Sequence, residues 1–197
     1  MRVLAIDLGF RRNASACAIA YADGLTLHVP YVDEVLPGVG DPLVPSEVLG
    51  TFLAAGEAHG CTHVAGDTFG RDWALEYVRD AGMAWVDLSP SDVGPSYLFA
   101  RLLLRERRVR MARHDELMRQ LAETRVRALA GGRLSVEHGS REGRHGDMVS
   151  AFVGAAWALR DFLRSRSDTT LSEATERFSA SDDWDDDDSE PARYRLF

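Results

Sequence analysis

The feature that most constrains the fold is a run of three strand-like segments at the start of the chain. Residues 3–7 form a short apolar run that ends in Asp7 and leads into a glycine, which is typical of a buried strand. Two further apolar segments follow at 15–21 and 25–32, and an Asp-Gly pair between them is a hairpin signal. We therefore expect the fold to begin with an antiparallel meander of three strands.

Helices and strands alternate after this meander. Ser46 is a suitable N-cap for the first helix, and Gly82 is a suitable C-cap for the second. Three antiparallel strands followed by αβ units predict an α/β fold, with a mixed five-stranded sheet and helices on both faces. The expected helices are 46–58, 73–81 and 94–107, and the expected strands are 62–66 and 83–88.

The last third of the predicted domain is mostly helical. We expect a short extended piece at 109–111, a helix at 115–129, a short strand at 133–137 and a long apolar helix at 147–164. The composition becomes polar and acidic beyond this helix. The predicted organisation is one domain over 1–164 and a tail over 165–197 that is disordered or serves for docking.

The net charge of −8 is concentrated in that tail. Residues 168–197 hold ten acids and three arginines, so the other 167 residues carry a net charge of only −1. The domain could therefore still bind a polyanion through a local basic patch. We expect the acidic run at 182–188 to be solubilising, although it could also cover such a patch or dock on a partner.

Several classes of protein are excluded by composition. No apolar run is long enough to cross a bilayer, and the N-terminus lacks the features of a signal peptide. Cys17 and Cys61 have no metal-ligand spacing and are expected to be buried small residues. These features predict a cytoplasmic protein, located in the host cytoplasm if the gene belongs to a phage or prophage.

Three acids lie where an apolar segment meets a glycine-containing loop. Asp7 ends the first strand, Asp67 ends the fourth, and Asp147 opens the last helix. If the first and fourth strands are neighbours, Asp7 and Asp67 meet at one end of the sheet, and a helix packed over that end adds Asp147. Grouped carboxylates suit hard cations such as Mg²⁺ or Mn²⁺. Each acid alone could instead be a turn or capping residue.

The order of motifs resembles the nuclease domain of phage terminase large subunits, an RNase H-like family. Residues 3–9 and 15–20 resemble its first hairpin, and residues 66–70 (Gly-Asp-Thr-Phe-Gly) resemble its second acidic motif. Residues 114–121 match a pattern of an acid, then Leu, then Gln-Leu, while 143–151 resemble the third acidic motif. The resemblance covers about residues 1–164 and implies an RNase H-like fold.

The resemblance also implies an activity and a site. It implies a metal-dependent DNA endonuclease in which Asp7, Asp67 and Asp147 are the catalytic metal ligands. Phosphodiesters would be cleaved by a two-metal mechanism with Mg²⁺ or Mn²⁺. Gly146 stands where the family often has a further acid, so the second ion would have fewer protein ligands and could depend on bound DNA.

The chain departs from the family in its partners. A terminase large subunit carries an ATPase motor, whereas this sequence has no lysine and therefore no Walker-type phosphate loop. The chain is therefore either a nuclease domain cut from a longer protein or a stand-alone relative. The expected partners are DNA and, for a stand-alone relative, a separate packaging ATPase or another phage assembly protein. No membrane partner is expected.

Further residues are candidates for supporting roles. Asp72 is either a helix cap or an auxiliary acid, and His145 is either an exposed loop residue or a group that binds metal, water or phosphate. The stretch 101–127 carries nine arginines and four acids, a net charge of +5 that favours DNA-backbone contact over a merely solvated face. The predicted DNA-binding residues are Arg11, Arg12, Arg101, Arg105, Arg108, Arg110, Arg141 and Arg144.

Two alternatives remain open within the same fold. A Holliday-junction resolvase would also begin with a strand ending in Asp-x-Gly and finish with an Asp on a helix. A catalytically silent RNase H-like module that binds a partner or nucleic acid would fit Gly146 and the missing motor. A sugar-kinase or actin-like phosphate site also begins with Asp-x-Gly, but the chain is too short for that two-domain fold.

Overall fold

A computed structural model describes residues 1–9, 13–38, 40–68, 71–129, 134–139, 146–164 and 194–195. Most of the predicted tail lies outside this part of the chain, and so do five predicted site residues. These are Arg11, Arg12, Arg141, Arg144 and His145.

The core of the fold is a mixed sheet of six strands in the order β5-β4-β1-β2-β3-β6. The predicted meander is present, because β1 pairs antiparallel with β2, and β2 with β3. The other neighbouring pairs, β1–β4, β4–β5 and β3–β6, are parallel. The strands are β1 Arg2–Asp7, β2 Ser15–Asp23, β3 Thr26–Val35, β4 His63–Asp67, β5 Ala84–Leu88 and β6 Val109–Met111.

The prediction of five strands was one too few. The extra strand is β6, which has only three residues and pairs with the start of β3. A segment this short shows no periodicity of its own, so only the pairing across the sheet identifies it as a strand.

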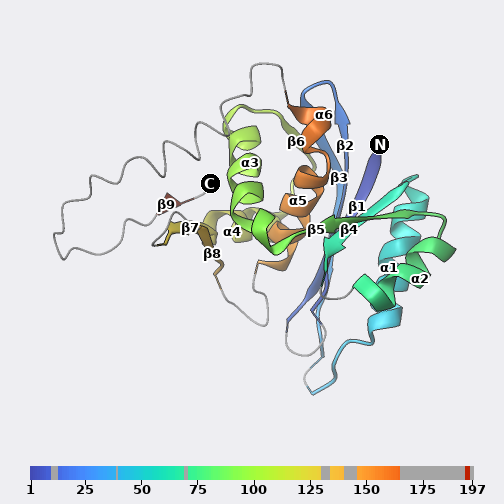
Figure 1. Cartoon of the computed structure of the whole chain (residues 1–197). Helices are drawn as coiled ribbons and strands as arrows, with labels where there is room; N and C mark the ends of the chain where they lie inside the picture. Colours follow the sequence, from blue (N-terminus) through green and yellow to red (C-terminus); the bar gives the residue numbers. More distant parts are fainter. Residues whose placement is uncertain are drawn as a thin grey trace.

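Helices cover both faces of the sheet, as predicted (Figure 1). Side chains alternate along β1, so that Val3 and Ala5 pack on the α3 and α5 side while Leu4 and Ile6 pack on the α1 and α2 side. The covering helices are α1 Pro45–Ala58, α2 Arg71–Asp80, α3 Val93–Arg105 and α5 Asp147–Ala158.

Helix α5 is the central helix of the molecule. Ten of its twelve residues are buried, because it lies between the sheet and α3. A helix that is apolar on all sides requires such a position. The predicted continuous helix over 147–164 is interrupted at Leu159, and a short helix α6 follows over Arg160–Leu163.

A second, smaller sheet lies beside α4 Asp115–Glu123. It has the order β8-β7-β9, with β7 Arg125–Ala128, β8 Leu134–Glu137 and β9 Tyr194–Arg195. The prediction of one helix over 115–129 was wrong in its second half. The backbone turns extended at Thr124, and β7 then pairs antiparallel with β8.

Two smaller features complete the described part of the chain. The N-cap of α1 is Val44, with a proline at the first helical position, so Ser46 is not the cap that we predicted. A single turn of 3-10 helix, η1 Pro90–Asp92, leads from β5 into α3. Among the described helices, none is long and apolar enough to cross a membrane.

Candidate active site

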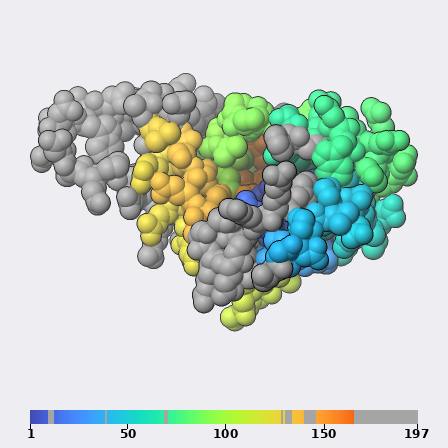
Figure 2. All heavy atoms as spheres, turned by 90° about the horizontal axis from the view of Figure 1, so that it is seen from below, coloured from blue at the N-terminus to red at the C-terminus, as the bar shows by residue number. Residues whose placement is uncertain are grey.

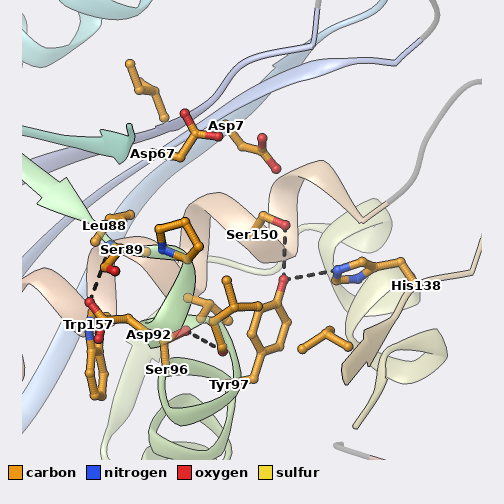
Figure 3. A pocket seen from close by; sticks show the side chains of 16 residues that line it. Asp7, Asp67, Leu88, Ser89, Asp92, Ser96, Tyr97, His138, Ser150 and Trp157 are labelled. Carbon is orange, nitrogen blue, oxygen red and sulfur yellow. Dashed lines mark hydrogen bonds between the residues drawn. The ribbon is translucent and has the colours of Figure 1, made fainter. Parts of the chain in front are cut away.

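Asp7 and Asp67 lie side by side at one end of the sheet. Strands β1 and β4 are parallel neighbours with Ala5 opposite Ala65, and each acid follows two residues later on its own strand. Both carboxylates line a cavity of about 390 Å³ between the sheet end, η1, α3, β8 and α5 (Figure 3). In the view of Figure 2, β1 lies at the base of a hollow in the surface.

Asp147 approaches this pair from the other layer. It is the first residue of α5 and is only 6% exposed. Gly146 precedes it with a left-handed backbone, φ +84°, which turns the chain into the helix. The approach of Asp147 to Asp7 is close enough that its charge acts on Asp7 more strongly than the charge of Asp67 does.

The electrostatics of Asp7 are those of a crowded acidic site. Burial is the main cause that raises the pKa of Asp7 to about 7, and the charges of Asp147 and Asp67 raise it further. The Ser150 side chain, which lines the same cavity, lowers the pKa of Asp7 in part. Near neutral pH the protonated and ionised forms of this carboxyl are therefore both populated, and a bound cation would favour the ionised form.

The donor set fits a divalent cation, since three carboxylates supply the hard oxygen ligands that Mg²⁺ and Mn²⁺ prefer. The fit is incomplete. In the part of the chain that the structure describes, no group of three or more His, Cys, Asp or Glu side chains is already arranged to hold a metal ion. The acids are thus coupled electrostatically but are not preassembled as a closed ligand shell.

Gln120 fixes the beginning of α5. Its side chain is 2% exposed, and Oε1 accepts hydrogen bonds from the backbone N–H groups of Met148 at 3.1 Å and Val149 at 3.4 Å. Nε2 of Gln120 donates to Glu116 at 2.9 Å. The first N–H groups of a helix lack partners within the helix, so this side chain serves as a cap supplied by α4. It thereby holds Asp147 in place.

We predict that Gln120→Leu lowers the free energy of unfolding by about 2 kcal/mol, because two buried N–H groups lose their acceptor. Urea denaturation followed by circular dichroism measures the change. Met118→Ala is the control, since Met118 is 48% exposed on the same helix. Equal stability of Gln120→Leu and the control would show that the cap contributes nothing.

Asp72 does not line the cavity with Asp7 and Asp67. It is an exposed residue in the first turn of α2, where a carboxylate interacts favourably with the helix N-terminus. Asp72 is the second residue of α2 rather than its N-cap, so its charge acts on the helix dipole from inside the first turn.

The described arginines that we predicted to bind DNA lie away from the acids. Arg110 pairs across the sheet with His28, near the start of β3, whereas the acids lie at the end where β3 finishes. Helix α3 carries Tyr97 at the cavity and Arg105 in its last turn, about 12 Å further along the helix axis. Arg101 lies between them and is half-buried. The predicted basic surface and the acidic site are therefore separate.

Arg108 has structural contacts. Its guanidinium donates to the carbonyl oxygens of Leu25 and Leu163 and pairs with Glu106 at 2.7 Å. These bonds tie the β2–β3 turn and the end of α6 to the end of α3. The side chain is occupied by the protein itself, so we leave it out of any proposed DNA surface.

Three polar residues of the cavity carried no signal in the sequence. Tyr97 and Ser150 were expected only as parts of helices, and His138 only as part of a loop. The Tyr97 hydroxyl lies 3.0 Å from Ser150 Oγ and 3.2 Å from His138 Nε2 (Figure 3). Only the packing of α3, α5 and β8 around one cavity brings these groups together.

Solved structures share this fold. The large terminase nuclease from the thermophilic phage G20c superposes with a TM-score of 0.61 at 18% identity, covering 80% of this chain and 81% of that chain. The nuclease domain of the large terminase subunit gp2 of bacterial virus Sf6 gives 0.60 at 13% identity, with 78% and 86% covered. The predicted resemblance to the RNase H-like nuclease domains of phage large terminases is thus confirmed at the level of the fold.

The chain spans only part of one longer protein that it resembles. The HK97 bacteriophage large terminase superposes with a TM-score of 0.66 at 19% identity, covering 80% of this chain. The present chain spans about two fifths of that protein, since 39% of it is covered. No protein-family model and no curated protein sequence matches the chain.

Metal ions are present in some of these related structures. The G20c nuclease has been solved with bound cobalt, and the Sf6 domain with calcium and with manganese together with beta-thujaplicinol.

Proposed function

We propose that this protein is a divalent-metal-dependent endonuclease that cleaves the phosphodiester bonds of DNA, in the manner of a terminase nuclease domain and with two ions. The observation that carries the proposal is the meeting of three carboxylates at one end of the sheet. Asp7 and Asp67 line one cavity, and burial together with the charges of Asp147 and Asp67 raises the pKa of Asp7 to about 7. Repulsion between neighbouring carboxylates costs stability, so such a cluster favours a function.

The three acids would hold the cation. Asp7 and Asp67 present oxygens from adjacent strand ends, and Asp147 adds a third carboxylate from the start of α5. A bound divalent cation would neutralise these charges, polarise the phosphodiester and lower the pKa of a coordinated water. Gln120 keeps Asp147 at the helix start, and the Ser150 hydroxyl lies in the same cavity as Asp7.

The substrate would be held mainly through its backbone. Arg11 and Arg12 follow Asp7 closely in sequence, and Arg141 and Arg144 precede Asp147 by a few residues. Arginine suits bidentate contact with phosphate oxygens, so we propose these four for the scissile strand. Arg101, Arg105 and Arg110 would meet flanking duplex only if DNA extends to the far end of the sheet.

The proposed partner is a packaging ATPase, either fused to this nuclease in a longer chain or carried by a separate protein. The chain corresponds to about two fifths of the HK97 large terminase, and its sequence has no Walker-type phosphate loop. A packaging motor or another phage assembly protein would then deliver DNA to the nuclease.

Nicking of supercoiled plasmid in Mn²⁺ tests the proposed activity. The wild-type protein should nick the plasmid, EDTA should stop it, and Asp147→Asn or Asp67→Asn should lower the rate at least about 100-fold. Asp72→Asn is the matched control, because it removes an exposed acid outside the cavity. Retained nicking by Asp147→Asn would overturn the assignment.

One observation favours a second candidate, a catalytically silent nucleic-acid-binding module. Among the described residues, no three His, Cys, Asp or Glu side chains are close enough together to hold a metal ion. Calorimetric titration with Mn²⁺ separates the two candidates. A silent module would bind DNA without measurable Mn²⁺ binding, whereas the nuclease would bind the metal and lose this binding in Asp7→Asn.

A further inference from the structure

A chain of polar side chains connects β8 to the acidic site. Thr124 and His138 come from the ends of α4 and β8, Tyr97 comes from α3, and Ser150 comes from α5. Thr124 Oγ1 lies 3.3 Å from His138 Nδ1, His138 Nε2 lies 3.2 Å from the Tyr97 hydroxyl, and that hydroxyl lies 3.0 Å from Ser150 Oγ. Ser150 lines the same cavity as Asp7, and its hydroxyl lowers the pKa of that carboxyl.

We propose that His138 is a positioning residue of this site, acting on Asp7 through Tyr97 and Ser150. The inference rests on the proposed function, because it concerns how the chain orients a carboxylate that would hold a cation. His138 itself contacts neither Asp7 nor Asp67 through any described hydrogen bond, although it lines the same cavity (Figure 3).

The direction of the hydrogen bonds follows from Thr124. Its hydroxyl donates to the backbone oxygen of Gln120 at 2.8 Å, so its one hydrogen is used. Thr124 Oγ1 must then accept from His138, which places the ring hydrogen on Nδ1. In a neutral imidazole Nε2 is then an acceptor, and the Tyr97 hydroxyl donates to it.

This order decides what Ser150 does. The Ser150 hydroxyl has one hydrogen and two acceptors within reach, the Tyr97 oxygen and the Asp7 carboxylate. Tyr97 can accept from Ser150 only while its own hydrogen is bonded to His138. Without His138, Tyr97 would turn its hydrogen toward Ser150, and the Ser150 hydrogen would be released from Tyr97 toward the Asp7 carboxyl.

Packing holds the imidazole in this place. The left-handed backbone at Gly146 leaves an opening that the His138 ring fills, and a Cβ at position 146 would overlap the ring atoms Nδ1 and Cγ. Thr124 is fully buried and Tyr97 is 4% exposed, so water does not compete freely for their hydroxyls. The ring therefore has one position, which a positioning residue requires.

Two substitutions separate this role from a purely structural one. His138→Gln keeps a polar group near the position of Nε2 and can still reach Tyr97, whereas His138→Asn keeps one near Nδ1 and can reach only Thr124. If His138 acts through Tyr97, the Asn variant is defective and the Gln variant is rescued. If His138 only held Thr124 in place, the Gln variant would be defective and the Asn variant would behave like the wild type.

The measurement is Mn²⁺ binding by calorimetry on the full chain, with plasmid nicking over a range of Mn²⁺ concentrations beside it. We expect His138→Asn to weaken Mn²⁺ binding roughly tenfold and to shift the half-saturating concentration equally, while His138→Gln stays near wild type. Tyr97→Phe should weaken Mn²⁺ binding as much as His138→Asn does. The double variant, with both substitutions, should bind Mn²⁺ no more weakly than either single variant. His28→Asn, at the other end of the sheet, is the control.

The outcomes distinguish the two proposals. If the wild type binds Mn²⁺ and nicks DNA but His138→Asn and His138→Gln behave alike, the positioning role is wrong and the nuclease proposal stands. If the wild type neither binds Mn²⁺ nor nicks DNA, the proposed function fails, and this inference with it. Thermal melting of each variant shows that it is folded.

Discussion

Asp7→Asn is expected to abolish metal-dependent nicking and, without metal, to make the protein more stable. Burial, Asp147 and Asp67 raise the pKa of Asp7 from 3.8 to about 7, so ionising this carboxyl costs free energy in the folded state. Asparagine has nearly the same shape and no charge. At pH 8 we expect the variant to be more stable by about 2 kcal/mol, a value that allows for partial exposure of the side chain.

The sign of the pH dependence follows from the raised pKa. Between pH 4 and 7 the folded protein keeps the proton on Asp7 while the unfolded chain releases it, so the stability of the wild type falls as the pH rises through this window. The stability of Asp7→Asn lacks this contribution. The difference in melting temperature should therefore be near zero at pH 4 and roughly 4–8 °C in favour of the variant at pH 8.

Adding Mn²⁺ should reverse the order. An ion that binds only the folded state stabilises it by about 2.7 kcal/mol at 100 times its dissociation constant, and the variant would lack this gain. Thermal melting at pH 8 with and without Mn²⁺ gives both results, with Asp72→Asn as the control. If Asp7→Asn melts below the wild type in metal-free buffer at pH 8, ionised Asp7 does not destabilise the folded protein, and the raised pKa is wrong.

Introducing an acid at position 146 is expected to damage the protein. Gly146 has φ +84°, and a Cβ on it would overlap the His138 ring. We expect Gly146→Asp to lower the free energy of unfolding by roughly 3 kcal/mol, from backbone strain together with this overlap. Mn²⁺ binding should weaken, because the start of α5 carries Asp147.

Two variants isolate the cause. Gly24 also has a positive φ, +55°, but a Cβ there would meet no atom within 4 Å, so Gly24→Asp should show only the backbone cost of about 1 kcal/mol. Adding His138→Ala to Gly146→Asp should recover part of the loss, since the ring is removed. Urea denaturation gives the stability of the wild type, of Gly24→Asp, of Gly146→Asp, of His138→Ala and of the double variant. Additive effects of the two substitutions would show that the ring and position 146 do not compete for space.

The local pattern along the chain predicted the meander, the helices on both faces and the acids at strand and helix ends. Apolar alternation and glycine-bearing turns are local properties, so β1, β2 and the acid at the end of β1 could be predicted from neighbours in sequence. The same reasoning failed for 125–128, where four residues show too little periodicity to interrupt a predicted helix. The pairing of β7 with β8 was needed to identify that strand.

The sequence by itself determined which residues we propose to carry the chemistry: Asp7, Asp67 and Asp147, each at a boundary between an apolar segment and a loop. The tertiary structure decided what surrounds them. Gln120 caps a helix that starts 27 residues later, His138 fills the space beside Gly146, and Arg108 and Arg110 lie at the far end of the sheet. These relations depend on how distant segments pack, and a pattern of neighbouring residues does not contain that information.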